Sequence, residues 1–149
     1  MSLKEVINAD IKKAMLEKKK NELTALRAIK SAILLAETEK GASEELNETS
    51  ELKLLAKQAK QRKDSADIYQ KEGRADLAEK EQKELEIISR YLPEQLSDDD
   101  IRAELQNIID KVGATGPQDM GKVMGVATKQ MSGKADGKKI SELVKSLLN

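Results

Sequence analysis

The residues best suited to binding chemistry lie in one short stretch near the C-terminus. Residues 132–139 read Ser-Gly-Lys-Ala-Asp-Gly-Lys-Lys and combine two glycines with three lysines. Glycines allow a ligand to approach the backbone N–H groups closely, and lysines attract anions. Asp136 is placed to cap a helix that follows. The composition favours an anion site, although it matches neither the GxxxxGK[ST] nor the GxGxxG phosphate loop.

Charge around this stretch is uneven. Residues 122–149 hold six lysines against two acids, whereas residues 94–110 hold six acids against one arginine. The whole chain has 27 basic and 27 acidic side chains, so attraction to nucleic acid has to come from local clusters. We expect four lysines to contact phosphates: Lys122, Lys129, Lys134 and Lys138.

Two glycines lie inside a predicted helix just before this stretch. Gly121 and Gly125 are one turn apart, and each costs a helix about 1 kcal/mol relative to alanine. One interpretation is that they let a neighbouring helix pack closely. The other is that they let a phosphate backbone approach.

A second basic cluster lies in a predicted helix earlier in the chain. No acid occurs between Leu52 and Lys63, and the basic residues there are Lys53, Lys57, Lys60, Arg62 and Lys63. A charged run of this kind is typical of a solvated helix face. Arg62, however, falls in the apolar stripe, as does Glu81 on the next helix, which predicts a partly buried Arg62–Glu81 ion pair. Catalysis by Glu81 or Glu84 is the alternative.

Most of the side chains that enzymes use are missing. The chain has no Cys and no His, so it lacks a thiol nucleophile, the commonest general base and the commonest zinc ligands. We therefore expect no catalytic residue, no cofactor and no metal site, and we interpret the chain as a binding module. Only 1% of residues are aromatic, which counts against RNA binding by base stacking.

The elements that must position these residues are helices throughout. A capping box at Ser2 and Glu5 predicts a first helix to about Lys19, and Asn21 is expected to cap a second that ends at Gly41. Two further helices are predicted to end at Gly73 and Pro93. Apolar residues at helical spacing mark the predicted core: Ile7, Ile11, Leu26, Ile29, Ile33, Leu55, Ala66, Leu77, Leu85 and Ile88.

The best domain boundary lies at Pro93, because proline stops a helix and Ser97 before three aspartates begins another. We predict an all-α chain with a helical domain over 1–92, a joint at 93–97, and a small three-helix domain over 98–149. The N-terminus is charged where a signal peptide would be apolar, and no apolar run could span a membrane. A cytoplasmic protein is expected.

Several motifs, in order and at their spacings, resemble those of the YqeY family. They are Lys60-Gln61-Arg62-Lys63-Asp64-Ser65-Ala66, Tyr69, Gly73-Arg74, Asp76-Leu77-Ala78, Glu81, Tyr91-Leu92-Pro93-Glu94-Gln95-Leu96, Asp119-Met120-Gly121-Lys122-Val123-Met124 and Gly133-Lys134-Ala135-Asp136-Gly137. The resemblance runs nearly end to end. The family is similar to the C-terminal part of GatB, the B subunit of the tRNA-dependent amidotransferase, where a helical segment precedes a small tail that touches tRNA.

This resemblance implies an accessory role in tRNA-dependent amidation. It maps tRNA contacts onto Asp119 through Lys122 and Gly133 through Asp136, including Ala135. GatB's own active site lies in a separate domain, so a carbon–nitrogen ligase label with glutamine as amido donor would be inherited from the family. GatB tails usually have Pro where this chain has Gly137.

Two functions of different class therefore stand open. The first is an RNA-binding module for tRNA that reads shape through phosphates. The second is a protein-interaction adaptor for an amidotransferase or an aminoacyl-tRNA synthetase, using the Met-bearing helix of the small domain and the basic helix. Neither involves a membrane.

Overall fold

The computed structural model describes residues 1–39 and 46–149, and every element in these ranges is helical. The described residues form seven α-helices and one 3-10 turn, and the chain divides into two compact units, residues 1–92 and 93–149. The predicted all-α class is confirmed. No helix in the described ranges is both long and apolar enough to cross a membrane.

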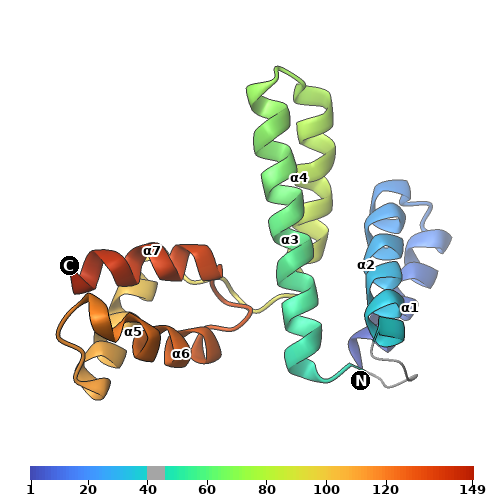
Figure 1. Ribbon diagram of the computed structural model, residues 1–149. Coiled ribbons are helices and arrows are strands. Elements are labelled where there is room, and N and C mark those ends of the chain that lie inside the picture. The colour runs from blue at the N-terminus through green and yellow to red at the C-terminus, as the bar shows by residue number, and fades with distance from the viewer. Residues whose placement is uncertain (40–45) are drawn as a thin grey trace. The chain divides into compact units, whose positions relative to one another are not determined.

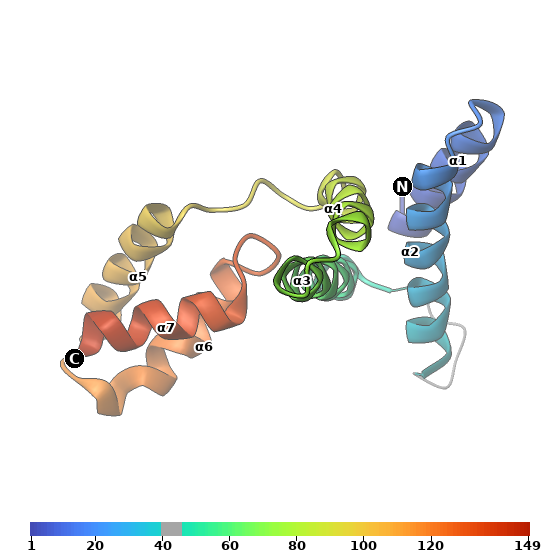
Figure 2. The ribbon, with the colours of Figure 1, turned by 90° about the horizontal axis from the view of Figure 1, so that it is seen from above.

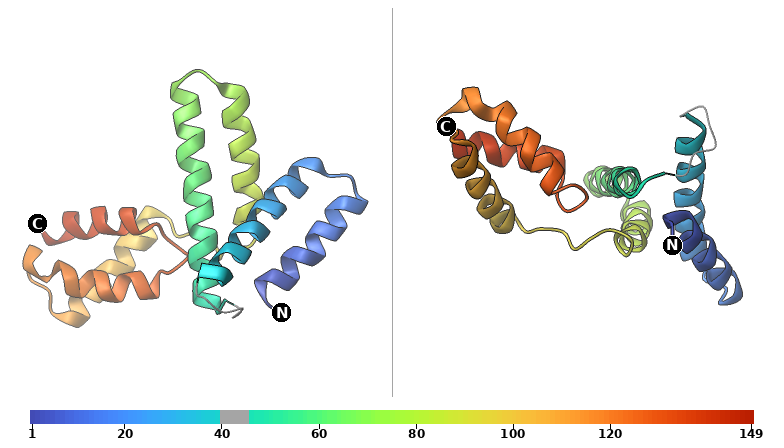
Figure 3. Two further views of the ribbon diagram at one scale, coloured as in Figure 1. Left: turned by 45° about the vertical axis from the view of Figure 1, so that its right-hand side comes forward. Right: turned by 90° about the horizontal axis from the view of Figure 1, so that it is seen from below.

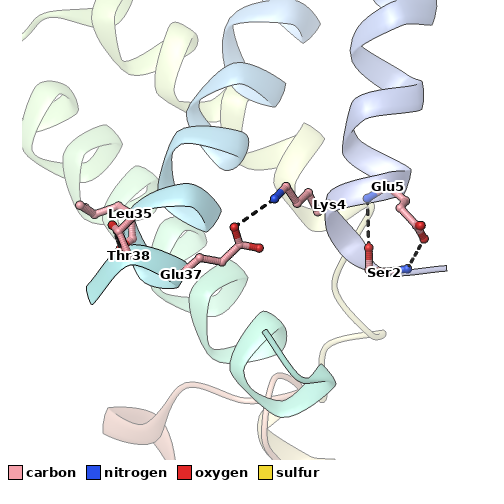
Figure 4. A network of polar contacts seen from close by, with 6 residues as sticks. All are labelled: Ser2, Lys4, Glu5, Leu35, Glu37 and Thr38. Carbon is pink, nitrogen blue, oxygen red and sulfur yellow. Dashed lines mark hydrogen bonds and ion pairs between the residues drawn. The ribbon is translucent and has the colours of Figure 1, made fainter. Parts of the chain in front are cut away.

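The first unit begins with a helical hairpin made of α1 (Leu3–Leu16) and α2 (Lys20–Glu39). The predicted capping box is present: the Glu5 N–H donates to Ser2 Oγ at 3.2 Å, and the Ser2 N–H donates to Glu5 Oε2 at 2.9 Å (Figure 4). Lys4, at the start of α1, forms an ion pair with Glu37, near the end of α2, at 3.1 Å. This pair links the two helices at the end of the hairpin away from its turn.

The turn between these helices is tighter than predicted. Lys18 has a left-handed backbone with φ of 55°, and the Lys19 N–H donates back to the Ala14 carbonyl. The chain therefore leaves α1 at Leu16 rather than Lys19. Asn21 lies inside α2, so its predicted role as a cap is wrong; the predicted helix end at Gly41 lies outside the described residues.

Helices α3 (Glu48–Lys71) and α4 (Ala75–Ser89) form a second, antiparallel hairpin (Figure 1). Figure 2 shows them end-on and side by side. Asn47 caps α3, and Gly73, with φ of 73°, makes the turn that ends it as predicted. Helix α4 stops at Ser89, short of Pro93. The Leu92 N–H donates to the Ser89 carbonyl, an i−3 bond, because the chain tightens before the proline.

The core of this unit is aliphatic. Helix α2 packs mainly against α1 and α4, and Ile7, Ile29 and Ile33 are each 2% exposed or less. The other buried members are Leu3, Ala14, Ala25, Leu26, Leu46, Leu55, Ile87 and Ile88.

The second unit contains α5 (Asp98–Val112), the 3-10 turn η1 (Pro117–Asp119), α6 (Met120–Gln130) and α7 (Gly137–Leu148). Ser97 caps α5 as predicted, accepting a hydrogen bond from the Asp100 N–H. The three α-helices lie against one another (Figure 3), and their buried side chains form one core. That core is Ile101, Leu105, Ile108, Ile109, Val123, Ala127, Met131, Ile140, Leu143, Val144 and Leu148.

The strained turn at Lys18 yields a stability prediction. Lys18→Gly should raise the free energy of unfolding by about 1 kcal/mol, since a left-handed backbone costs a residue with a side chain about 1–2 kcal/mol. The matched control, Lys12→Gly in the exposed interior of α1, should lower it by about 1 kcal/mol. Urea unfolding followed by tyrosine fluorescence measures both, because Tyr69 and Tyr91 lie in the first unit. Destabilisation by both variants would contradict the prediction.

Candidate nucleic-acid interface

The loop between α6 and α7 is held by its own backbone. Gly133 has φ of 75°, a conformation that glycine adopts without strain. The N–H groups of Lys134 and Ala135 both donate to the Met131 carbonyl, at 3.0 and 3.2 Å, and the Met131 side chain is fully buried. Because these two N–H groups are occupied, a ligand of this loop would meet mainly side chains.

The segment before α5 fastens the same loop from the other side. Gln95 Nε2 donates to the Gly133 carbonyl at 2.7 Å, and the Leu96 N–H donates to the Lys134 carbonyl at 2.9 Å. The loop carbonyls are thereby held against the protein, while the Lys134 side chain is exposed. The sequence predicts a joint at 93–97 but does not indicate this role, because the partners are nearly forty residues apart.

The start of α7 is already capped. Asp136 accepts a hydrogen bond from the Lys138 N–H at 3.4 Å, which confirms the predicted cap. The carboxylate occupies the place where an external anion would meet a helix N-terminus, so the end of α7 is a poor anion site by itself. Lys138 is exposed, whereas Lys139 pairs with Asp98 of α5 at 3.1 Å.

The two glycines of α6 face open space. A Cβ atom added at Gly121 or at Gly125 would meet no atom of the described chain within 4 Å. The interpretation that these glycines let a neighbouring helix pack closely is therefore wrong: the core of this unit lies on the opposite side of α6, at Val123 and Ala127. Room for a neighbouring element therefore does not explain their helix cost of about 1 kcal/mol each.

Lysines flank this bare helix face. Lys122 and Lys129 are seven residues apart, so they lie on the same side of α6, and both are exposed. Neither forms an ion pair with a described residue, and the same holds for Lys134 and Lys138. The outward face of α6 thus combines free cations with a backbone that lacks side-chain cover.

Asp119 and Pro93 both accept hydrogen bonds within the 93–149 unit. Asp119 accepts a hydrogen bond from the Thr115 N–H at 3.0 Å and so closes the turn that leads into α6. The Pro93 carbonyl accepts from Gln95 Nε2 at 2.9 Å, the same amide group that holds Gly133. The Asp119 carboxylate therefore has a partner within the protein, whereas Pro93 contributes only its backbone carbonyl.

In the first unit, charge is gathered between α3 and α4. Arg62 Nη1 lies 3.2 Å from Glu81 Oε2, which confirms the predicted pair, and also 3.2 Å from Glu84 Oε2. Glu84 is only 9% exposed. The structure therefore adds a second carboxylate, and the cluster joins the two helices through one guanidinium.

The remaining motif residues of this unit do not gather at a site. Asp64 is exposed, Ser65 and Tyr69 are half-buried, and the Tyr69 carbonyl accepts from the Arg74 N–H at 2.8 Å. The Arg74 side chain pairs with Asp76 at 3.5 Å on the surface. These contacts shape the α3–α4 turn.

Comparison with known proteins shows the family of the chain. The sequence model described as Yqey-like protein matches residues 4–148. The chain belongs to the YqeY family. Among its curated relatives is "Altered inheritance of mitochondria protein 41, mitochondrial" of Clavispora lusitaniae, 40% identical over 111 residues, which are 72% of this chain and 63% of that protein.

Two more YqeY-family relatives carry the same name. The protein of Lachancea thermotolerans is 33% identical over 74% of this chain and 60% of its own length, and that of Pyrenophora tritici-repentis is 30% identical over 93% and 78%. The chain thus spans less than two thirds of the first two relatives. All three are named as mitochondrial, which contradicts the expected cytoplasmic location.

A polar contact that the sequence did not reveal connects Tyr91 to α1. Its hydroxyl donates to Asp10, beside an open cleft of about 320 Å³ whose rim includes the Arg90–Glu22 ion pair at 2.7 Å. Burial, then the hydrogen bond and the charge of Asp10, raise the pKa of Tyr91 above its ordinary value. The cleft lining holds three basic and three acidic side chains, so it offers no net attraction for an anion.

The Arg62 cluster predicts that removing the Arg62 guanidinium lowers the free energy of unfolding. Arg62→Met should lower the free energy of unfolding by about 2 kcal/mol, because Glu81 and Glu84 would face each other without a counter-ion at a partly buried position. Adding Glu81→Gln and Glu84→Gln should recover most of that loss. Urea unfolding followed by tyrosine fluorescence measures each step; a single variant as stable as the wild type would show that the cluster contributes nothing.

The raised pKa of Tyr91 predicts that the free energy of unfolding depends on pH in the alkaline range. Its pKa is raised in the folded state, so its contribution to the free energy of unfolding is complete below about pH 10 and declines as pH rises further, where the unfolded chain ionises first. The stability advantage of the wild type over Tyr91→Phe should therefore shrink above that pH. Urea unfolding of both proteins from about pH 8 to about pH 11 tests this; a constant difference across the range would contradict it.

Proposed function

We propose that the chain is a tRNA-binding accessory module and that its 93–149 unit contacts the phosphate backbone through α6 and the α6–α7 loop. The observation that carries the proposal is the pair of exposed glycines on α6, Gly121 and Gly125, flanked by Lys122 and Lys129. A helix face without side chains, bordered by unpaired lysines, suits a partner whose backbone carries charge and needs no apolar pocket.

The distribution of apolar side chains supports RNA over a protein partner for this unit. Every large hydrophobic residue that is strongly exposed in the described chain lies in residues 1–92. The methionines of α6 do not form an outward surface, since Met120 and Met124 pack against the core and Met131 is buried. Protein interfaces usually have an apolar centre, and this unit offers none.

A link to tRNA-dependent amidation, through an amidotransferase or an aminoacyl-tRNA synthetase, is part of the same proposal and rests on the resemblance to the tail of GatB. In this proposal Gly133 and Ala135 allow the loop to approach the RNA, while Lys134 and Lys138 supply charge. Asp136 acts by capping α7, which fixes the position of Lys138.

The test measures tRNA affinity as a function of salt. If Lys122, Lys129, Lys134 and Lys138 each meet a phosphate, these four contacts should contribute about −3 to the slope of log K against log salt. Lys134→Glu should weaken binding of all tRNAs alike and flatten the slope by at least about 0.7, because Lys134 is exposed and its loss leaves the loop backbone intact. Wild-type binding no tighter than that of Lys134→Glu at low salt would end the RNA proposal in favour of the adaptor.

A second variant separates binding from folding. Gly125→Ala has room for its methyl group and should stabilise α6 by about 1 kcal/mol, yet it should weaken tRNA binding several-fold by covering the backbone. Asn107→Ala, exposed on α5 of the same unit, is the matched control and should leave binding unchanged. Circular dichroism reports the stability of each variant. Unchanged binding by Gly125→Ala would exclude close approach at this face.

A further inference from the structure

The outward side of α3 carries a row of lysines that is not part of the phosphate-contact surface proposed on α6. Lys53, Lys57 and Lys60 follow one another at intervals of four and three residues, so they lie on one side of the helix, and all three are exposed. The opposite side of α3 holds Leu55 and Ala66, which are buried. We call Lys53, Lys57 and Lys60 the α3 lysine row.

Arg62 belongs to the same basic stretch of sequence but is not part of this row. Arg62 turns inward and is bound by Glu81 and Glu84, so it is withdrawn from the outer surface. Lys53 and Lys57 form no ion pair with a described residue. They lie one turn apart on the helix, where two like charges repel each other. Asp64 closes the row at its C-terminal end.

The surroundings of the row indicate the class of partner. Ile68 is the one strongly exposed large hydrophobic residue of α3, and it lies two turns beyond Lys60. A row of ammonium groups without an apolar centre is a poor protein interface but is sufficient for phosphates, which are bound mainly through charge. Lysine also suits phosphates at variable positions, since its ammonium group is a mobile point charge with three donors.

We propose that the α3 lysine row is a second phosphate-contact surface, which binds the backbone of an RNA in addition to the contacts made by the 93–149 unit. The inference rests on the proposed tRNA-binding function and extends it to the first unit. The three lysines cover roughly 10 Å along the helix axis at 1.5 Å per residue, enough to follow two or three phosphates of a strand. No base contact is required, so the surface reads backbone and not sequence.

The experiment uses the full chain and two triple variants with the same loss of charge. The first is Lys53→Gln, Lys57→Gln and Lys60→Gln. The matched control is Lys12→Gln, Lys20→Gln and Lys71→Gln, which removes three exposed lysines scattered over α1, α2 and α3. The row variant should flatten the salt slope of tRNA binding by about 2 and weaken binding about tenfold or more at low salt, whereas the control should change the slope by less than about 0.5.

A second readout requires no substitution. Bound tRNA should slow chemical acetylation of Lys53, Lys57 and Lys60 in the wild type, measured by mass spectrometry, but should leave Lys12 and Lys71 unaffected. Equal behaviour of the two triple variants, or equal acetylation of all five lysines, would overturn the inference while leaving the proposed function intact. Polyglutamate binding as tight as tRNA binding at the same salt would also overturn it, in favour of an acidic protein partner. A wild type that binds no tRNA at all would instead refute the proposed function.

Discussion

Each helix of this protein can bury only a narrow stripe of aliphatic side chains, and the rest of the structure depends on that constraint. The chain has no Phe and no Trp, so the two largest apolar side chains are not available to fill the space between helices. The cores are filled instead by many aliphatic side chains. Examples are Ile7, Ile29 and Leu55 in one unit and Leu105, Val123 and Val144 in the other. Dense packing of this kind fixes the rotation of each helix, and so it also fixes which residues face outward.

Helix α6 shows how the buried stripe determines the binding surface. Val123 and Ala127 point into the core and cannot rotate away from it, which leaves Gly121, Lys122, Gly125 and Lys129 on the outside. A single apolar stripe therefore positions both the bare backbone and the cations that border it. The same logic applies to α3, where buried Leu55 and Ala66 place the lysine row in solvent.

Interior charge is used sparingly and is always satisfied. No buried side-chain nitrogen or oxygen in the described residues lacks a hydrogen-bond partner. Arg62 bridges Glu81 and Glu84 between α3 and α4, and the hydroxyl of Tyr91, two residues beyond α4, reaches Asp10 of α1. Aliphatic stripes can slide past each other by one turn at modest cost, whereas these polar contacts can form in one register only. We interpret them as the groups that select the alignment of α3 with α4 and the position of the segment after α4 against α1.

The sequence by itself determined the features that depend on residues close together in the chain. Helical spacing gave the stripes, and the caps at Ser2, Ser97 and Asp136 were readable because a capping side chain bonds to a backbone group two or three residues away. The Arg62–Glu81 pair was also readable, since two charges interrupted two apolar stripes. The mitochondrial naming of the relatives, in contrast, had no counterpart in the residues considered.

Tertiary structure decided everything that depends on partners far apart in sequence. Gln95 holds the Gly133 carbonyl, and Glu84 joins Arg62, because folding brings together groups that no local pattern links. The open space beside Gly121 and Gly125 is of the same kind: a glycine pair in a helix looks identical whether a helix covers it or nothing does. Only the rotation of α6, imposed by the packing of its opposite face, placed that pair at the surface.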